Sequence, residues 1–312
     1  MNRAGRNEHQ KEFVRLFNGL CGKYNRHEVW QDFVWLAATA ISNGVDKRYA
    51  EQREERYMST IGKYAKNEQS VFPDLFALIV LGMEEAPDQD FLGELYMELE
   101  LGNDHAGQFF TPYDVCRAMA MVTLDRGLVQ HEIERQGYFS LNDPACGAGA
   151  TLVAAANVLR EWGINYQQTA LFVAQDIDYT VGLMCYIQLS LLGCAGYVRI
   201  GNTLTDPMTG SVLHGGSNDD RTWFTPMYMH PTWQLRRSVD SVKRFLGSLP
   251  GKATENPSQT IEEEPLCQSA QDEKSEGKAV ATAEQDAPAL IEIGKKKRHR
   301  QSEGQLMFDL PI

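Results

Sequence analysis

The stretch that decides the fold is Asn142-Asp143-Pro144-Ala145-Cys146-Gly147-Ala148-Gly149. It follows a short apolar run, 138–141, that predicts a strand, and it precedes the apolar run 150–162, which predicts a helix. Glycines at such a junction let the backbone turn sharply and approach a ligand closely, and the start of the helix offers free N–H groups. The stretch therefore predicts a ligand-binding loop between a strand and a helix.

A second acidic group stands at the end of the next predicted strand. This strand, 171–175, runs into Gln175-Asp176-Ile177-Asp178, so that Asp176 lies 33 positions beyond Asp143. A carboxylate at the tip of a second strand can accept hydrogen bonds from ribose hydroxyls, which favours a nucleoside-bearing cofactor. The alternative is that Asp176 only caps the following helix.

The pattern around these two strands predicts an α/β domain behind a helical region. Further strands are expected at 197–200 and 223–228, with helices at 113–126, 150–162 and 180–192. This alternation is typical of a parallel, doubly wound sheet. Up to about residue 105 the apolar residues recur at three- and four-residue intervals, which predicts helices over 8–43 with a break at 22–25, then over 46–66, 72–83 and 89–99.

Composition divides the 312 residues into three parts. Beyond about residue 249 the chain turns polar, with ten acidic and three basic residues in 250–292, too charged to repay the entropy of ordering. We therefore expect a helical region at 1–105, an α/β domain at 106–249, and a disordered tail at 250–312 that ends in a basic run, 295–300, and a short apolar segment.

Charge and cysteine usage exclude several classes of protein. There are 30 basic and 42 acidic side chains, a net charge of −12, so that bulk charge does not draw the chain onto nucleic acid. Any phosphate-facing patch must be local, such as Arg236, Arg237, Lys243 and Arg244. The six cysteines form no C-x-x-C pair, which predicts no metal site and an intracellular protein; without a run of about 18 apolar residues we expect a cytoplasmic protein with no membrane contact.

Residues 107–206 resemble the cofactor half of N6-adenine DNA methyltransferases, especially the modification subunit of type I restriction systems. Phe110-Thr111-Pro112 is similar to the segment before that family's first strand, 143–149 to its Asp-Pro-x-Cys-Gly-x-Gly loop, and Gly201-Asn202-Thr203-Leu204 to its Gly-Asp-Thr-Leu, with Asn in place of Asp. The resemblance implies a Rossmann-like methyltransferase sheet and S-adenosyl-L-methionine as cofactor. The residues that it implies for cofactor binding are Phe110, Thr111, Pro112, Asp143, Pro144, Ala145, Cys146, Gly147, Gly149, Asp176, Asn202 and Thr203.

The family's catalytic motif is missing. Methyltransferases of this family place Asn-Pro-Pro-Tyr or a variant after the fourth strand, where acceptors hold the amine of a flipped adenine and the aromatic ring stacks on it. The nearest match in position is Thr225-Pro226-Met227-Tyr228, which we take as the candidate catalytic residues. Loss of one good acceptor costs about a hundred- to a thousandfold in rate, so activity would be impaired but not excluded. The alternative is that this tetrapeptide is an ordinary junction between strand and loop.

Only about twenty residues separate Tyr228 from the polar tail, so we expect the sheet to stop after its fourth strand. The resemblance then implies weak DNA binding by the chain alone and a protein partner for target recognition. Gln305-Leu306-Met307-Phe308 loosely resembles the peptide that bacterial proteins insert into the sliding clamp.

Two functions follow from these observations. The first is an S-adenosylmethionine-dependent DNA methyltransferase specific for adenine N6, weak or dependent on a partner, within restriction-modification. The second is a catalytically inactive methyltransferase-like module that binds the cofactor or DNA and acts through interaction.

Overall fold

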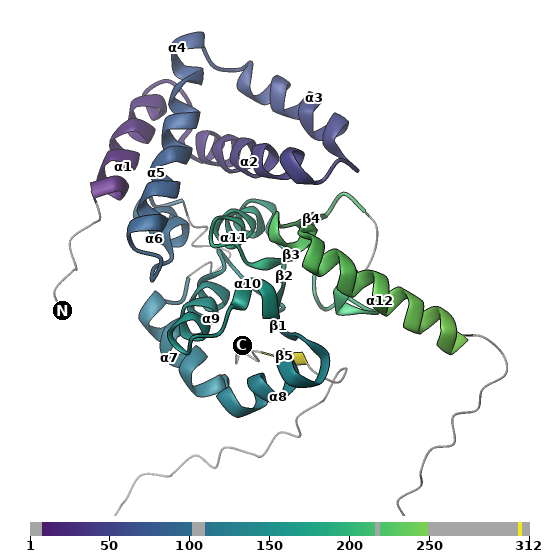
Figure 1. Ribbon diagram of the computed structural model, residues 1–312. Helices are drawn as coiled ribbons and strands as arrows, with labels where there is room; N and C mark the ends of the chain where they lie inside the picture. Colours follow the sequence, from purple (N-terminus) through teal and green to yellow (C-terminus); the bar gives the residue numbers. More distant parts are fainter. Residues whose placement is uncertain (1–7, 102–109, 216–218, 249–304, 308–312) are drawn as a thin grey trace, which may run out of the picture.

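The computed structural model describes residues 8–101, 110–215, 219–248 and 305–307, and four strands and the segment 305–307 form its sheet. Figure 1 shows the N-terminal helices stacked on one side of this sheet and a long C-terminal helix on the other. None of the helices within these ranges is long and apolar enough to cross a bilayer.

Six helices lie within the described residues before the α/β part, where the periodicity predicts five, because the helix expected at 46–66 ends at Ile61 and a separate short helix follows it. The break at 22–25 falls between the first two, where the side chain of Asn25 accepts hydrogen bonds from the backbone N–H groups of His27 and Glu28 and so starts the second helix. The aromatic rings of Phe13, Phe17 and Phe33 pack around the buried Trp30. The six helices are α1 (Glu8–Cys21), α2 (Arg26–Val45), α3 (Ala50–Ile61), α4 (Lys66–Gln69), α5 (Val71–Glu85) and α6 (Phe91–Glu98).

The sheet confirms the α/β fold class. Three parallel strands, β1 (Phe139–Asp143), β2 (Ala170–Asp176) and β3 (Ala195–Ile200), lie in the order β3-β2-β1, with Leu141 opposite Phe172 and Val173 opposite Tyr197. The helices between them are α9 (Ala150–Glu161), α10 (Tyr166–Thr169) and α11 (Tyr179–Leu191).

The fourth strand differs from the prediction. β4 (Thr222–Phe224) is shorter than the expected 223–228, pairs with β3, and runs antiparallel to it. Thr225 leaves the strand because Pro226 has no backbone N–H to donate to a ladder, and Met227–Met229 forms a turn of 3-10 helix, η3. The prediction of a fully parallel sheet is therefore wrong at this edge.

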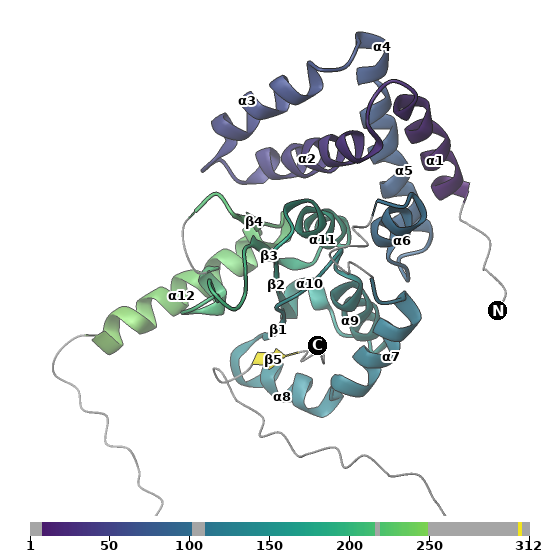
Figure 2. The same ribbon diagram turned by 180° about the vertical axis from the view of Figure 1, so that it is seen from behind.

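The edge of β1 is occupied by β5 (Gln305–Met307). Its backbone pairs parallel to β1, with Ser140 opposite Gln305 and Asn142 opposite Met307. Figures 1 and 2 both show this strand beside β1, far in sequence from the rest of the sheet. The C-terminal segment thus lies within the sheet, whereas the residues of the predicted tail at 250–304 and 308–312 lie outside the described ranges.

Helices cover both faces of the sheet. On one face α7 (Tyr113–Thr123), α8 (Arg126–Gln136), α9 and α11 share a single core with the N-terminal helices. On the other face η2 (Val212–His214), η3 and α12 (Pro231–Ser248) enclose a smaller core around Tyr197, Phe224 and Trp233. α8 as a separate helix and the full length of α12 were not predicted from the sequence, because the polar faces of these helices dilute the apolar pattern.

Candidate functional site

The loop between β1 and α9 has the shape that its glycines predict. Gly147 has φ of 54° and Gly149 has φ of 97°, both in the left-handed region that side chains disfavour. A Cβ atom on Gly149 would stand 2.8 Å from Cys185 Sγ, so that this loop packs directly on α11. The backbone N–H of Cys146 donates to Gln175 O at 3.0 Å, which fixes the loop across the end of β2.

Asp176 lies beside this loop at the end of β2. Its Oδ2 accepts a hydrogen bond of 2.8 Å from Gly147 N, and its Oδ1 accepts one of 2.9 Å from Asp178 N. Burial raises the pKa of the Asp176 carboxyl above its ordinary value. The N-terminal cap of α11 is Asp178, whose Oδ1 accepts from Val181 N at 3.0 Å, so the role of helix cap is taken by another residue.

Asp143, at the end of β1, is buried inside the loop. One of its oxygens accepts from Ala145 N at 3.1 Å and the other accepts from the Thr151 hydroxyl. Burial raises its pKa as well. Pro144 accepts a hydrogen bond at its carbonyl oxygen from the Thr203 hydroxyl, which joins the loop after β3 to the loop after β1.

Asn202 shapes the turn after β3. Its Oδ1 accepts hydrogen bonds from Leu204 N at 2.9 Å and from Thr205 N at 3.3 Å. Its side-chain oxygen is therefore shared with the backbone of the turn, a bonding role that the resemblance did not imply. Gly201 N donates to Asp176 O at 2.8 Å and brings this turn against the end of β2.

The segment before α7 reaches the same loop. Ring atoms of Phe110 lie 3.5 Å from where a Cβ on Gly147 would be, and its ring stacks on Tyr96 with centroids 5.4 Å apart. Thr111 accepts at its carbonyl oxygen from Cys116 Sγ, and Pro112 is the N-terminal cap residue of α7. Of the predicted cofactor residues outside the loop, the structure thus places Phe110, Asp176 and Thr203 against it, while Thr111, Pro112 and Asn202 are their neighbours in sequence.

The site fits a ligand with several hydrogen-bond donors. Asn142 Oδ1 and Gln175 Oε1, near the ends of β1 and β2, are buried and have no partner among the described residues. Buried acceptors are normally paired, so these two favour a ligand that supplies N–H or O–H groups. The ammonium, ribose hydroxyls and adenine amine of S-adenosylmethionine are such donors.

The candidate catalytic tetrapeptide lies elsewhere. Because β4 is antiparallel, its end meets the start of β3, and the Thr225 hydroxyl donates to Cys194 O at 2.7 Å and accepts from Gly196 N at 3.0 Å. Thr225 is 0% exposed, and the Tyr228 hydroxyl donates to Leu213 O at 2.7 Å inside the smaller core. The candidate catalytic residues lie at the end of the sheet where β3 starts: Thr225, Pro226, Met227 and Tyr228. The glycine loop lies at the opposite end, where β1 and β2 finish, so the structure does not bring the two predicted sites together.

The expected phosphate-facing arginines also have structural partners. Arg236 donates to the carbonyl oxygens of Gln168 and Gly137, and Arg237 donates to Tyr228 O at 2.7 Å while its guanidinium lies 3.9 Å from the centroid of the Tyr228 ring. These two side chains hold α12 against the body of the protein.

A strand–glycine loop–helix unit with an acidic group at the end of the second strand is the arrangement of Rossmann-like folds that bind nucleoside-bearing cofactors, among them the S-adenosylmethionine-dependent methyltransferases. Residues 88–234 match the model of the family described as N-6 DNA Methylase. The family uses S-adenosylmethionine, so the expected family and cofactor are both confirmed.

Two solved structures are similar to the chain at low identity. One is described as a class I S-adenosylmethionine-dependent methyltransferase from Listeria monocytogenes (16% identity, TM-score 0.37), with 67% of this chain and 58% of that chain covered. The other is a methyltransferase subunit of a type I restriction-modification system from Streptococcus thermophilus (20% identity, TM-score 0.36), with 64% and 41% covered. The chain therefore spans less than two thirds of the length of either. A comparison with curated proteins gives no match.

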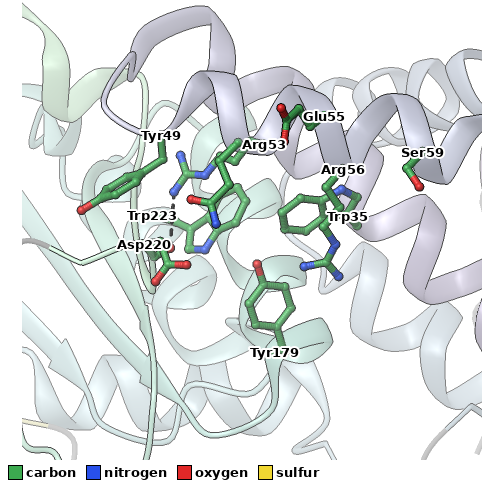
Figure 3. A pocket seen from close by; sticks show the side chains of 10 residues that line it. Trp35, Tyr49, Arg53, Glu55, Arg56, Ser59, Tyr179, Asp220 and Trp223 are labelled. Carbon is green, nitrogen blue, oxygen red and sulfur yellow. Dashed lines mark hydrogen bonds between the residues drawn. The ribbon is translucent and has the colours of Figure 1, made fainter.

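A cavity of about 450 Å³ that the sequence did not predict lies between the N-terminal helices and the start of α11, and we call it the second cavity to distinguish it from the cofactor site (Figure 3). Its walls combine aromatic rings with two arginines from one face of α3. The residues that line it are Trp35, Tyr49, Gln52, Arg53, Glu55, Arg56, Ser59, Tyr179, Asp220 and Trp223. The one available signal was Tyr179, which follows the acidic motif directly; the two tryptophans are too far apart in sequence to suggest a common site.

Proposed function

We propose that this chain binds S-adenosylmethionine and serves as the cofactor-binding component of an adenine-N6 DNA methyltransferase that acts together with a partner protein. The observation that carries the proposal is the separation of the two predicted sites. The glycine loop and Asp176 lie at the end of the sheet where β1 and β2 finish, and Thr225 and Tyr228 are buried at the opposite end, where β3 starts.

The cofactor half of the proposal rests on the acceptors around the loop. Asp176 would accept hydrogen bonds from the ribose hydroxyls, and the first N–H groups of α9 would face the carboxylate end of the ligand. Asn142 Oδ1 and Gln175 Oε1 would accept hydrogen bonds from donor groups of the same ligand. Bound S-adenosylmethionine supplies a methyl group activated on sulfonium.

The transfer half requires groups that hold the adenine amine. The lone pair of the adenine amine is delocalised into the ring, which makes the amine a poor nucleophile. A hydrogen-bond acceptor must therefore hold the amine where it meets the methyl group. The Thr225 hydroxyl already forms hydrogen bonds with Cys194 O and Gly196 N. It cannot reach the glycine loop unless these bonds at the start of β3 break. The acceptor is therefore proposed to come from a second protein, which would also supply target recognition and most of the DNA contact.

A surface on α12 supports the partner. Leu235, Val239, Val242 and Leu246 recur at spacings of four, three and four residues and are 44–66% exposed. This is the a/d spacing of a helix that packs along another helix. We propose an amphipathic helix of the partner protein as its occupant.

The proposal is tested first by calorimetry with S-adenosylmethionine. The wild type should bind, and Asp176→Asn should lose at least tenfold in affinity because an amide cannot accept from two ribose hydroxyls and two backbone N–H groups. Glu84→Gln, the same chemical change on an exposed helix position, should bind like the wild type. Absence of binding to the wild type would overturn the proposal.

A second measurement concerns methyl transfer. Labelled cofactor and unmethylated DNA should give no N6-methyladenine with this chain alone and should give it when the partner is added. Transfer by the chain alone that survives Thr225→Val and Tyr228→Phe would show that the base is held by other residues of this chain.

The second candidate is a catalytically inactive module that binds the cofactor or DNA. It is favoured by the complete burial of Thr225 and by the structural bond of the Tyr228 hydroxyl. It predicts cofactor binding without methyl transfer in the presence of every partner that associates with the chain, whereas the first candidate requires turnover with at least one of them.

A further inference from the structure

The second cavity has aromatic walls and a cationic side. The rings of Trp35 and Tyr179 are stacked, with centroids 5.9 Å apart and an interplanar angle of 29°, and Trp223 meets Trp35 edge-on at 5.6 Å. Figure 3 shows Arg53 and Arg56 descending from α3 toward these rings. Both faces of the cavity thus present flat, polarizable surfaces.

The two guanidinium groups lie over the indole rings. Arg56 Cζ lies 3.8 Å from the centroid of Trp35, and Arg53 Cζ lies 3.9 Å from that of Trp223. Arg53 is almost fully buried and is fixed by Ser42 Oγ at 2.5 Å and by Asp220 O. Arg56 is exposed, and no carboxylate of the described residues forms an ion pair with it. Arg53 therefore serves the fold, and Arg56 offers its charge to the cavity.

Two buried donors in the walls have no partner. Trp35 Nε1 and Trp223 Nε1 are inaccessible to solvent and bond to nothing among the described residues. The side chains are 6% and 0% exposed, so this cost is not relieved by bulk water. Because these two atoms are inaccessible, the cavity itself offers its occupant the aromatic faces and the exposed charge of Arg56, which favour a flat ring and a negative group.

From these observations we propose that the cavity binds a nucleotide unit, a flat base joined to a phosphate. The base would stack on the aromatic and guanidinium planes, as unpaired bases do on protein surfaces, and the phosphate would pair with Arg56. The carboxylates of Glu55 and Asp220 at the cavity wall favour a base with an exocyclic amine, such as adenine.

This site is lined by other residues than the cofactor site. Tyr179 is the first residue of α11 and follows Asp176 by three positions, but the other walls of the cavity come from α2, from Tyr49 and α3, and from Asp220 and β4. The nucleotide comes either from solution, as a free mononucleotide, or from a single strand of DNA. Binding at this site does not require the proposed methyl transfer.

The test is calorimetry with deoxyadenosine monophosphate and with a short single-stranded oligodeoxyadenylate, on the full chain. Stacking on an aromatic residue is worth about fivefold to about 150-fold in affinity per base, so Arg56→Gln, which removes a stacked and charged plane, should weaken binding at least fivefold. Arg56→Lys keeps the positive charge but lacks the planar guanidinium group, so its affinity for the nucleotide should lie between those of the wild type and Arg56→Gln. Arg15→Gln, on the exposed surface of α1, is the control and should bind like the wild type.

The outcomes separate the ligand source and the two proposed sites. An oligonucleotide that binds much more tightly than the mononucleotide identifies a DNA strand as the ligand, and equal affinities identify the free nucleotide. Asp176→Asn should leave nucleotide binding unchanged while it weakens S-adenosylmethionine binding, so that failure of one site is distinguishable from failure of the other. No saturation of the wild type by either ligand up to millimolar concentration, or equal affinity of wild type and Arg56→Gln, would overturn the proposal.

Discussion

Gln188 donates a hydrogen bond of 2.7 Å from its Nε2 to Asp90 Oδ1, and both side chains are buried between α6 and α11. The same Nε2 donates to Ala148 O at 2.8 Å, and Gln188 Oε1 accepts from Leu92 N at 3.2 Å. One amide thus joins the last N-terminal helix, a central helix of the α/β part and the glycine loop. The position of the loop depends on the N-terminal helices as well as on the sheet.

Asp90 makes this junction sensitive to pH. Burial raises the pKa of its carboxyl from 3.8 to about 6. Between these values the folded state keeps a proton that the unfolded state gives up, so the free energy of unfolding should fall as pH rises from about 4 to about 6 and level off above. The side chain of Asp90→Asn cannot titrate. In urea unfolding at pH 4, 5, 6 and 7, the free energy of unfolding of the wild type relative to this variant should therefore fall from about pH 4 to about pH 6 and then level off. Parallel pH profiles for the two proteins would contradict this assignment.

Gly149 should tolerate no side chain. In Gly149→Ala the new Cβ would stand 2.8 Å from Cys185 Sγ at a φ of 97°, so both contact and backbone conformation are unfavourable. We expect a loss of about 1–3 kcal/mol in the free energy of unfolding and weaker S-adenosylmethionine binding, because the loop must move. Gly210→Ala is a matched control, since Gly210 has φ of 90° but no atom within 4 Å of the new Cβ. Equal effects of the two substitutions would show that the packing on Cys185 is unimportant.

The cofactor loop could be predicted from sequence because its determinants are local. A strand, two glycines with positive φ and a helix follow one another within residues 139–161, and Asp176 ends the adjacent strand. Parallel neighbours place their carboxyl ends at the same edge, so the two acidic groups meet without any long-range information. The break in the N-terminal helices was predictable for the same reason, since Asn25 caps the helix that it precedes.

The placement of β4 could not be predicted in this way. A run as short as Thr222–Phe224 pairs equally well in either direction, and its choice of β3 depends on contacts such as Trp223 with Trp35 across 188 positions of sequence. The second cavity depends on the same long-range packing. The edge of β1 is occupied by β5 and not by β4.

Thr225 is expected to contribute to stability and not to cofactor binding. Thr225→Val keeps the shape of the side chain but leaves Cys194 O and Gly196 N without the hydroxyl. Buried groups that lose a partner cost about 1–3 kcal/mol, so the midpoint of urea unfolding should fall. Calorimetry should give an unchanged affinity for S-adenosylmethionine. A lower affinity at unchanged stability would instead connect Thr225 to the site.

The pairing of β5 with β1 predicts a measurable effect of the C-terminal segment. A chain that ends at Gly304 lacks this strand and leaves an open edge on β1, opposite the present register from Ser140 to Asn142. Backbone amides of 139–143 should then exchange with deuterium faster, while those of 195–200, two strands away, should keep their rates. Unchanged exchange at β1 would show that β5 adds no protection. Since no comparison supports a sliding-clamp motif at Gln305 to Phe308, pairing within the chain is the role that we test.

The exposed apolar side chains of Leu235, Val239, Val242 and Leu246 form a stripe along α12, and charged substitutions within this stripe should not change the stability of the fold. Val242 and Leu246 are 56% and 61% exposed, and the helix is held to the body by Trp233, Arg236 and Arg237 near its start. Val242→Glu with Leu246→Glu should therefore leave the thermal midpoint within a few degrees of the wild type and S-adenosylmethionine affinity unchanged. It should lower the fluorescence of a hydrophobic dye, because the apolar surface that binds the dye is interrupted. Ser238→Glu with Ser241→Glu adds the same charge to the same helix beside the stripe and is the control for charge alone. If the glutamates at 242 and 246 unfold the protein, the stripe is packed in solution against some part of this chain or a second copy, and it is not the docking surface proposed for the partner.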